Sequence, residues 1–591
     1  MFTVNDRYNE LNQLDKEQIE ANGKKLFSTF TYNANGQPLT LTFDTEKELE
    51  YSYDSLGRLT GKALNLGTPL QYSYSYYLSQ RAGTSSVTYE TNRLKEEIIG
   101  DSKYVYSYDD RGNITSIQEE IKTIVAEEEV IQMEETHSYV YDDKNQLIRE
   151  NNYSQDKTIV YNYDKGGNLL SRDEYDYTTA ENIEPTTLKN TIEYDYSPQW
   201  KDQLVEINGS KIKYDAIGNP TEYFGKNLTW NGRKLIEYKD GDAITTYTYN
   251  ADGLRSTKTT GTEITEYYYV GDLLSYEKRG DKELYYTYDL SGNIVRIRYV
   301  NRTSDNTYYP AVNSRGDVEA LYKEDGTAAV RYSYDTWGNI LSIKDGNGEN
   351  IEGATHIGLV NPIRYRGYYY DSETGFYYVS SRYYDPEVGR FISADGQIAG
   401  VGGNISAYNL YGYCGNNPIN RFDPDGHAWK DVKNWFSKTW NKVKTVVNNI
   451  KNTIKKSINK SAENHYSRNK KNKVNDSIDN IVKNYTKVSE WADKYHENTS
   501  GRQGSQAKYN DKYLSPNGGH YEVIICNAPN IEPYIVDELV DVSNMGTYNY
   551  AANDSFIPIY YAEHLVKDMI PYYLYGNTRD DTKGWLKWAL D

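Results

Sequence analysis

Cysteine, methionine and phenylalanine are scarce in this sequence. Among its 591 residues there are 2 cysteines, 4 methionines and 10 phenylalanines. The two cysteines, Cys414 and Cys526, lie far apart, which excludes a disulfide-rich scaffold and a paired zinc-ligand spacing. We therefore interpret them as two independent thiols.

Long hydrophobic segments are also missing from the sequence. No apolar run approaches the ~20 residues that a helix needs to cross a bilayer, so we expect no transmembrane segment. The first residues, MFTVNDRYNELNQLDKEQIEANGKKL, lack the apolar stretch of a secretory signal peptide. Either export uses another route or this chain is the end of a longer one, and we favour the second interpretation.

Tyrosine, in contrast, is abundant, with 64 copies. Each buried tyrosine hydroxyl needs water or a hydrogen-bond partner. This requirement favours a sheet or a thin shell with wet edges over a dry globular core. A chain of this length is expected to hold about two to four domains.

The net charge of −19 is distributed unevenly. Residues 1–427 carry 43 Lys and Arg against 66 Asp and Glu, whereas residues 428–591 carry 23 against 19. Within the second part, residues 429–473 hold 13 basic and 2 acidic residues. Because an acidic surface repels nucleic acid, we expect no nucleic-acid binding by the first 427 residues. A basic segment is expected to join two acidic bodies.

A short motif recurs along the first part of the chain, at spacings from about 20 to about 55 residues. Its copies read YSYDSLGRLT, YSYDDRGNIT, YVYDDKNQLI, YNYDKGGNLL, YDAIGNPT, YTYNADGLR, YTYDLSGNIV and YSYDTWGNIL. Alternation of aromatic and polar residues places the tyrosines of a strand on one face. The Asp and the Gly-Asn pair favour a tight turn with positive φ. Each copy therefore predicts a strand, a tight turn and a second strand.

These copies resemble the YD repeats of Rhs, WapA-like and teneurin proteins. The resemblance implies a mainly β fold, in which antiparallel hairpins coil into a spiralling sheet around a hollow interior. About 400 residues is less than such shells usually use, so we expect a partial shell, with residues 30–360 as its YD-repeat part. A plain extended antiparallel sheet is the alternative. Residues 1–29 are expected to be an N-terminal segment that is truncated or partly helical.

Residues 361–427 resemble the Rhs-associated core in RYRGYYYDSETGFYYVSSRYYDPEVGRFIS, YNLYGYCGNNPIN and DPDG. The resemblance implies a plug that turns inward and cleaves the chain just beyond DPxG, with two aspartates acting as an aspartyl-protease-like pair. Their counterparts are Asp395 and Asp423. Gly396 stands where many relatives have proline, and His427 where leucine often precedes the cut. The alternative role for both aspartates is that of ordinary turn residues.

Beyond the core, the sequence predicts two further parts. Residues 428–474 begin with apolar residues at spacings of three and four opposite a lysine-rich face, which predicts a basic amphipathic helix followed by a linker. Such a helix packs on protein or lies on an anionic membrane. Residues 475–591 are expected to form a small α+β domain. In Rhs and WapA-like proteins this place is taken by a variable toxin.

Candidate catalytic residues in that tail lie on one predicted strand and one predicted helix. His520 and Glu522 alternate along HYEVIICNA and so face one side, and His564 and Asp568 are spaced i, i+4 on a helix. A histidine with a carboxylate partner suits the general base of a nuclease-like hydrolase. The alternative is a structural histidine or solvated charge. The pattern assigns no cofactor and no metal, and Asp541 is the nearest candidate for a third metal ligand.

Two functions compete at this stage. The first is a polymorphic toxin of bacterial competition, secreted or displayed on the cell surface, whose shell carries the tail as cargo for delivery into a target cell. It implies a cognate immunity protein and contact with the surface of the target cell. The second is an adhesion or carbohydrate-binding protein without catalytic activity, because tyrosine-rich surfaces also suit stacking on sugars.

Overall fold

The computed structural model describes residues 2–44, 46–80, 88–125, 128–396, 409–427 and 430–431. The chain divides into two units, Met1–Lys438 and Thr439–Asp591, and all described residues belong to the first. The predicted helix and α+β domain therefore lie outside the described residues, apart from Lys430–Asp431.

Thirty strands, each paired antiparallel with the next along the chain, make up most of the described part of this unit. They are β1 (Phe2–Tyr8), β2 (Leu14–Ala21), β3 (Lys24–Tyr32), β4 (Pro38–Phe43), β5 (Glu48–Tyr53), β6 (Leu59–Leu64), β7 (Leu70–Gln80), β8 (Thr88–Ile99), β9 (Ser102–Tyr108), β10 (Ile114–Val125), β11 (Glu128–Tyr141), β12 (Leu147–Asn152), β13 (Lys157–Tyr163), β14 (Leu169–Asp176), β15 (Leu188–Tyr196), β16 (Leu204–Ile207), β17 (Ser210–Tyr214), β18 (Pro220–Tyr223), β19 (Lys226–Asn231), β20 (Lys234–Asp240), β21 (Ala243–Tyr249), β22 (Arg255–Thr260), β23 (Glu263–Val270), β24 (Leu273–Arg279), β25 (Lys282–Tyr288), β26 (Ile294–Val300), β27 (Asp305–Val312), β28 (Val318–Tyr322), β29 (Ala328–Tyr334) and β30 (Ile340–Asp345).

The repeated motif forms the hairpins in the way the sequence predicts. In the turn after β17, Asp215 Oδ1 accepts hydrogen bonds from the backbone N–H groups of Ile217 and Asn219, and Gly218 has a φ of 84°. The Asp215 carboxylate thus accepts hydrogen bonds from backbone N–H groups that have no carbonyl partner within the turn. Asn219 also donates from its side chain to Asp215 Oδ2 at 2.8 Å.

The two tyrosines of a Tyr-x-Tyr motif have different roles. The first is at most 2% exposed at Tyr106, Tyr161 and Tyr286, whereas Tyr51 is half-buried. The second can donate its hydroxyl to a backbone carbonyl of an earlier hairpin, as Tyr249 does to Leu235 O at 2.7 Å. Such a bond fastens one hairpin to its predecessor and satisfies the tyrosine hydroxyl.

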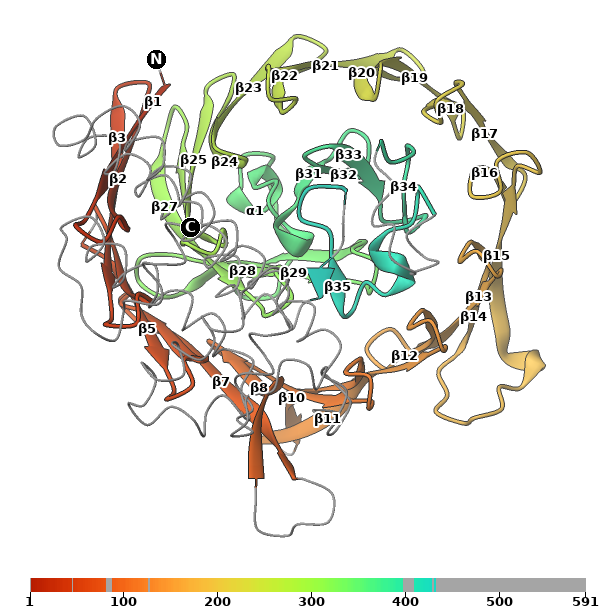
Figure 1. The fold of residues 1–591 in the computed structure, drawn as a ribbon, viewed down its shortest axis with the longest axis horizontal. Coiled ribbons are helices and arrows are strands. Elements are labelled where there is room, and N and C mark those ends of the chain that lie inside the picture. Colours follow the sequence, from red (N-terminus) through yellow and green to blue (C-terminus); the bar gives the residue numbers. More distant parts are fainter. Residues whose placement is uncertain are drawn as a thin grey trace, which may run out of the picture. The chain divides into compact units, whose positions relative to one another are not determined.

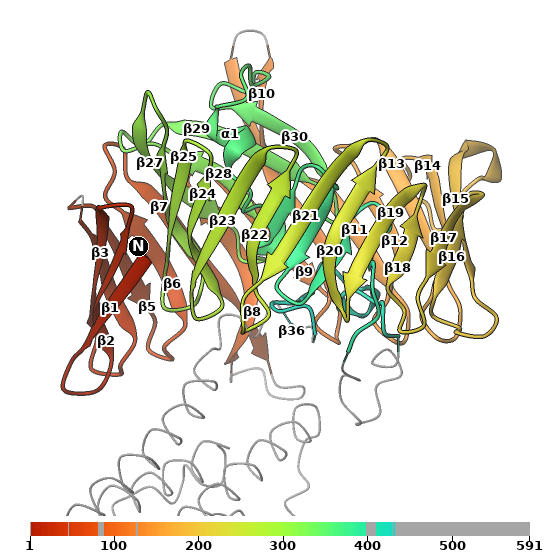
Figure 2. The ribbon, with the colours of Figure 1, turned by 90° about the horizontal axis from the view of Figure 1, so that it is seen from above.

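The sheet coils so that its late strands pass inside its early ones (Figure 1). Figure 2 shows the strands side by side along the wall. Where the ends overlap, Phe2 of β1 packs against Tyr268 of β23 with ring centroids 5.3 Å apart, and Lys24 forms a 2.8 Å ion pair with Asp305. The described strands β1 and β30 do not pair with each other, so the sheet is not closed. The predicted partial shell is confirmed, and the extended flat sheet is wrong.

The prediction of partial helix for residues 1–29 is also wrong, because β1, β2 and most of β3 occupy this segment. Its Asn22-Gly23 pair adopts φ values of 48° and 75° and connects β2 to β3. Two successive positive φ values are those of a type I′ hairpin turn. Residues of this segment therefore belong to the coiled sheet.

The described residues of the core segment, 361–396 and 409–427, lie inside the curve of the sheet (Figure 1). It follows the short helix α1 (Ile357–Val360) and contains a small sheet of β31 (Tyr369–Asp371), β32 (Phe376–Val379), β33 (Arg382–Asp385) and β34 (Arg390–Phe391). The core segment also contains the single helical turns η2 (Tyr365–Gly367) and η4 (Cys414–Asn416). Another such turn, η1 (Pro185–Thr187), lies between β14 and β15 of the large sheet.

The first described residues beyond the core differ from the prediction of a helix. Lys430–Asp431 form β36, which pairs antiparallel with β35 (Arg421–Phe422). Pairing with an existing strand satisfies the backbone of this short piece. At this point the helical periodicity of the sequence is overridden by tertiary structure.

Candidate functional site

Asp395 and Asp423 come together around one arginine of the core. Arg382, at the start of β33, places its Nη2 atom 3.1 Å from Asp395 Oδ2 and 3.7 Å from Asp423 Oδ2. The two oxygens therefore lie no farther apart than the sum of these distances. All three side chains are at most 6% exposed. The structure thus brings together the two aspartates that the sequence singled out, and it adds an arginine that the sequence did not.

The backbone around Asp423 is held by Tyr368. The Tyr368 hydroxyl donates to Asp423 O at 2.7 Å and accepts from Asp423 N–H at 3.0 Å. Asp423 Oδ1 then accepts from the backbone N–H of Gly426 at 2.9 Å, which closes the DPDG turn. Gly426 has a φ of 79°, and a Cβ there would lie 2.6 Å from Val379 O. Glycine is therefore required at this position.

Asp395 is positioned from two sides. Its backbone N–H donates to Leu410 O at 2.9 Å, and Arg233 donates to the neighbouring carbonyl of Ala394 at 2.7 Å. His427, the last residue of DPDGH, places its Nδ1 atom 3.0 Å from Asp395 Oδ1. The residue next to the predicted cut thus contacts one of the two aspartates directly.

The local electrostatics give Asp423 an unusual proton affinity. Burial raises the pKa of Asp423 to about 6, although the positive charge of Arg382 opposes the rise. Burial also lowers the pKa of Arg382, against the attraction of both aspartates. A carboxyl group with a raised pKa can act as a general acid while a neighbouring carboxylate activates water.

If Asp423 is the acid, cleavage should slow as the pH rises through about 6, because the proton that it must donate is then lost. Above that value the rate should fall about tenfold per pH unit. The measurement is the fraction of full-length chain that remains after a fixed time at a series of pH values. A rate that is constant across neutral pH would contradict this assignment.

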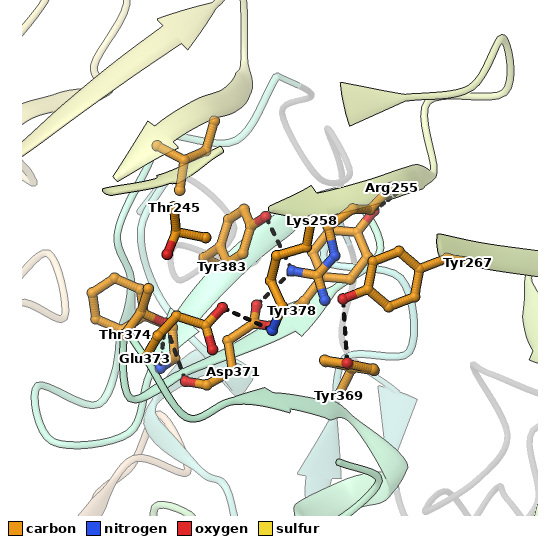
Figure 3. A network of polar contacts seen from close by, with 12 residues as sticks. Thr245, Arg255, Lys258, Tyr267, Tyr369, Asp371, Glu373, Thr374, Tyr378 and Tyr383 are labelled. Carbon is orange, nitrogen blue, oxygen red and sulfur yellow. Dashed lines mark hydrogen bonds and ion pairs between the residues drawn. The ribbon is translucent and has the colours of Figure 1, made fainter. Parts of the chain in front are cut away.

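A second buried cluster fastens the core sheet to the wall (Figure 3). Asp371 at the end of β31 forms ion pairs with Arg255 and with Lys258, the latter at 2.8 Å, and the side chains of Asp371 and Arg255 are fully buried. The Arg255 guanidinium lies 4.5 Å from the ring centroid of Tyr378 and 4.7 Å from that of Tyr267. Burial alone would raise the pKa of Asp371, but the two cations outweigh it and lower the pKa.

Asparagines of the core bind the hairpin turns at one edge of the wall. Asn417 donates to Asn113 Oδ1 at 3.1 Å and to Asn145 O at 2.8 Å, each in a different turn. Asn416 donates to Gly167 O at 2.7 Å in the next turn. These contacts set the path of the chain toward Asp423. The sequence signal for these contacts is the asparagine-rich stretch YNLYGYCGNNPIN, part of the segment that resembles the Rhs-associated core.

The candidate residues of the tail, His520, Glu522, His564 and Asp568, lie outside the described residues, as does Asp541. Within the described ranges no group of three or more His, Cys, Asp or Glu side chains could hold a metal ion. In the same ranges no helix is long and apolar enough to span a membrane. Cys414 is buried and unpaired by any disulfide.

Comparison with known proteins agrees with this architecture. The chain is 32% identical over 307 residues to the tRNA3(Ser)-specific nuclease WapA of Bacillus spizizenii, which covers 50% of this chain and 12% of WapA. It is 24% identical to the toxin subunit YenC1 of Yersinia entomophaga, over 70% of this chain and 47% of YenC1. The chain thus spans less than half the length of these relatives.

Among solved structures, the TcdB2-TccC3-Cdc42 crystal structure matches 71% of this chain and 23% of its own, with a TM-score of 0.50 and 19% identity. That likeness concerns the fold. The model of the teneurin YD-shell family matches residues 83–419, which is more than half of the chain. The protein therefore belongs to the teneurin YD-shell family.

Proposed function

We propose that the protein is a polymorphic toxin of bacterial competition. In this proposal the coiled sheet and its core hold a C-terminal effector, residues 475–591, and the core separates it by cutting the chain behind DPDGH. The observation that carries the proposal is the pair of buried aspartates around Arg382, located where the repeats end and the composition changes. Water attacks the carbonyl carbon of His427, Asp395 takes the proton of that water, and Asp423 protonates the departing nitrogen of Ala428.

For the effector we propose a nuclease-like hydrolase. One relative is named as a tRNA nuclease, and another as a toxin subunit. These names support an enzymatic toxin as the cargo. His520 and His564 are the proposed proton-transfer groups, with Glu522 and Asp568 as their orienting carboxylates. A cell that makes such an effector needs a cognate immunity protein. The toxin itself is displayed on the cell surface or secreted before the effector is delivered into a target cell.

The proposal predicts that the tail stops bacterial growth. The full chain, produced inside a bacterium without an immunity protein, should arrest growth, whereas a chain that ends at His427 should be harmless. His520→Ala or His564→Ala in the full chain should relieve the arrest, because each loss removes a proton transfer worth about 10²–10⁴ in rate. His496→Ala, in the same tail but outside the proposed site, is the matched control and should stay toxic.

Two outcomes of this growth assay would count against the proposal. Arrest by the chain that ends at His427 would show that toxicity does not come from the tail. Full toxicity of both histidine variants would show that the proposed hydrolase residues are wrong. The readout is the optical density of cultures after induction, together with immunoblots that confirm equal amounts of each chain.

A further inference from the structure

The imidazole of His427 makes a contact that the simple aspartate-pair mechanism does not need. Its Nδ1 atom lies 3.0 Å from Asp395 Oδ1, while Asp395 Oδ2 faces Arg382. When Asp395 acts as the base its carboxylate can only accept hydrogen bonds, so Nδ1 is the donor in this contact. The side chain of His427 is 35% exposed, which leaves the rest of the ring within reach of solvent.

This contact links the bond to be cut to the group that attacks it. In the proposed cut, the carbonyl of His427 itself receives the water, and Asp395 is the base. The backbone N–H of His427 donates to Asp425 Oδ1 at 3.1 Å, and Arg382 donates to the carbonyl of Gly426 just before it. The residue is thus held at its backbone, at its side chain and at the preceding carbonyl.

We propose that His427 is a positioning residue of the self-cleavage reaction, which anchors the His427–Ala428 bond on Asp395. The inference rests on the proposed function, because it concerns the same cut. Leucine, which often precedes the cut in relatives by resemblance, offers no such donor. The property therefore belongs to this chain and not to the motif.

Two variants test the anchoring. His427→Asn keeps an N–H donor at the position of Nδ1, and His427→Ala removes it. The chain is translated in vitro at a series of pH values, and the remaining full-length chain is quantified over time. His427→Ala should cut about 10–100-fold more slowly than the wild type, since misplacement by about 1 Å costs on this order. His427→Asn should cut at nearly the wild-type rate, because its amide N–H can still donate to Asp395.

The outcomes distinguish this inference from the proposed function. A His427→Ala chain that cuts as fast as the wild type, or a His427→Asn chain that cuts as slowly as His427→Ala, would overturn the anchoring. If the wild type is not cut at any pH, the proposed function fails together with the inference. To exclude misfolding, thermal unfolding of His427→Ala is compared with that of the wild type in an Asp395→Asn background, where the two should coincide.

Discussion

Asp395→Asn should leave the chain uncut while the fold is unchanged. Asparagine has the shape of aspartate, and its carbonyl oxygen can still accept hydrogen bonds from Arg382 or His427. It cannot take a proton from water, so the general-base step is lost, and the rate should fall by about 10²–10⁴-fold. Asp423→Asn should have a similar effect, because an amide cannot supply the proton that the departing nitrogen needs.

The matched control for both variants is Asp425→Asn. Asp425 belongs to the same turn and is more exposed, and its Oδ1 atom accepts from the backbone N–H of His427. An asparagine keeps that acceptor, so cutting should proceed at nearly the wild-type rate. The readout is the ratio of full-length chain to fragments on a denaturing gel. Continued cutting in Asp395→Asn would show that this residue is not the base.

Asp371→Ala should cause the largest loss of stability. It removes the only carboxylate that contacts both Arg255 and Lys258 among the described residues, and it leaves the buried Arg255 cation without the carboxylate of Asp371. Removing one partner of a buried ion pair typically costs about 3–5 kcal/mol. The free energy of unfolding, measured by denaturant titration, should fall by this amount. Because Asp371 ties the core to β22, the rate of self-cleavage should fall as well.

Glu222→Ala provides the comparison at the surface. Glu222 forms a 2.6 Å ion pair with Lys213, whose side chain is 67% exposed. Pairs of this kind contribute little because water and salt screen them, so the free energy of unfolding should change by less than about 1 kcal/mol. Equal losses for Asp371→Ala and Glu222→Ala would contradict the role that we assign to the buried cluster.

The hairpins could be predicted from the sequence because their determinants are local. A Tyr-x-Tyr-Asp strand end and its Gly-Asn turn lie within a few residues, and the turn at Asp215 has the predicted geometry. The Asn22-Gly23 pair is a local signal of the same kind, and the type I′ turn that it forms explains why residues 1–29 are strands and not partly helical.

The candidate site was only partly predictable. Asp395 and Asp423 were identified because short motifs mark them, whereas Arg382 lies in an ordinary strand sequence and becomes important only when the core folds back on itself. The pairing of Asp371 with Arg255 and Lys258 likewise joins the core to a distant strand of the wall. No periodicity encodes such long-range contacts. The docking of Asn416 and Asn417 on the turns belongs to the same class.

The most direct test of the account is the mass of the purified wild-type protein under denaturing conditions. Self-cleavage of the His427–Ala428 bond predicts two polypeptides, one that ends at His427 and one that begins at Ala428. For Asp395→Asn it predicts a single uncut chain. A wild-type preparation that contains only the intact 68.2 kDa chain, at pH values on both sides of 6, would contradict it.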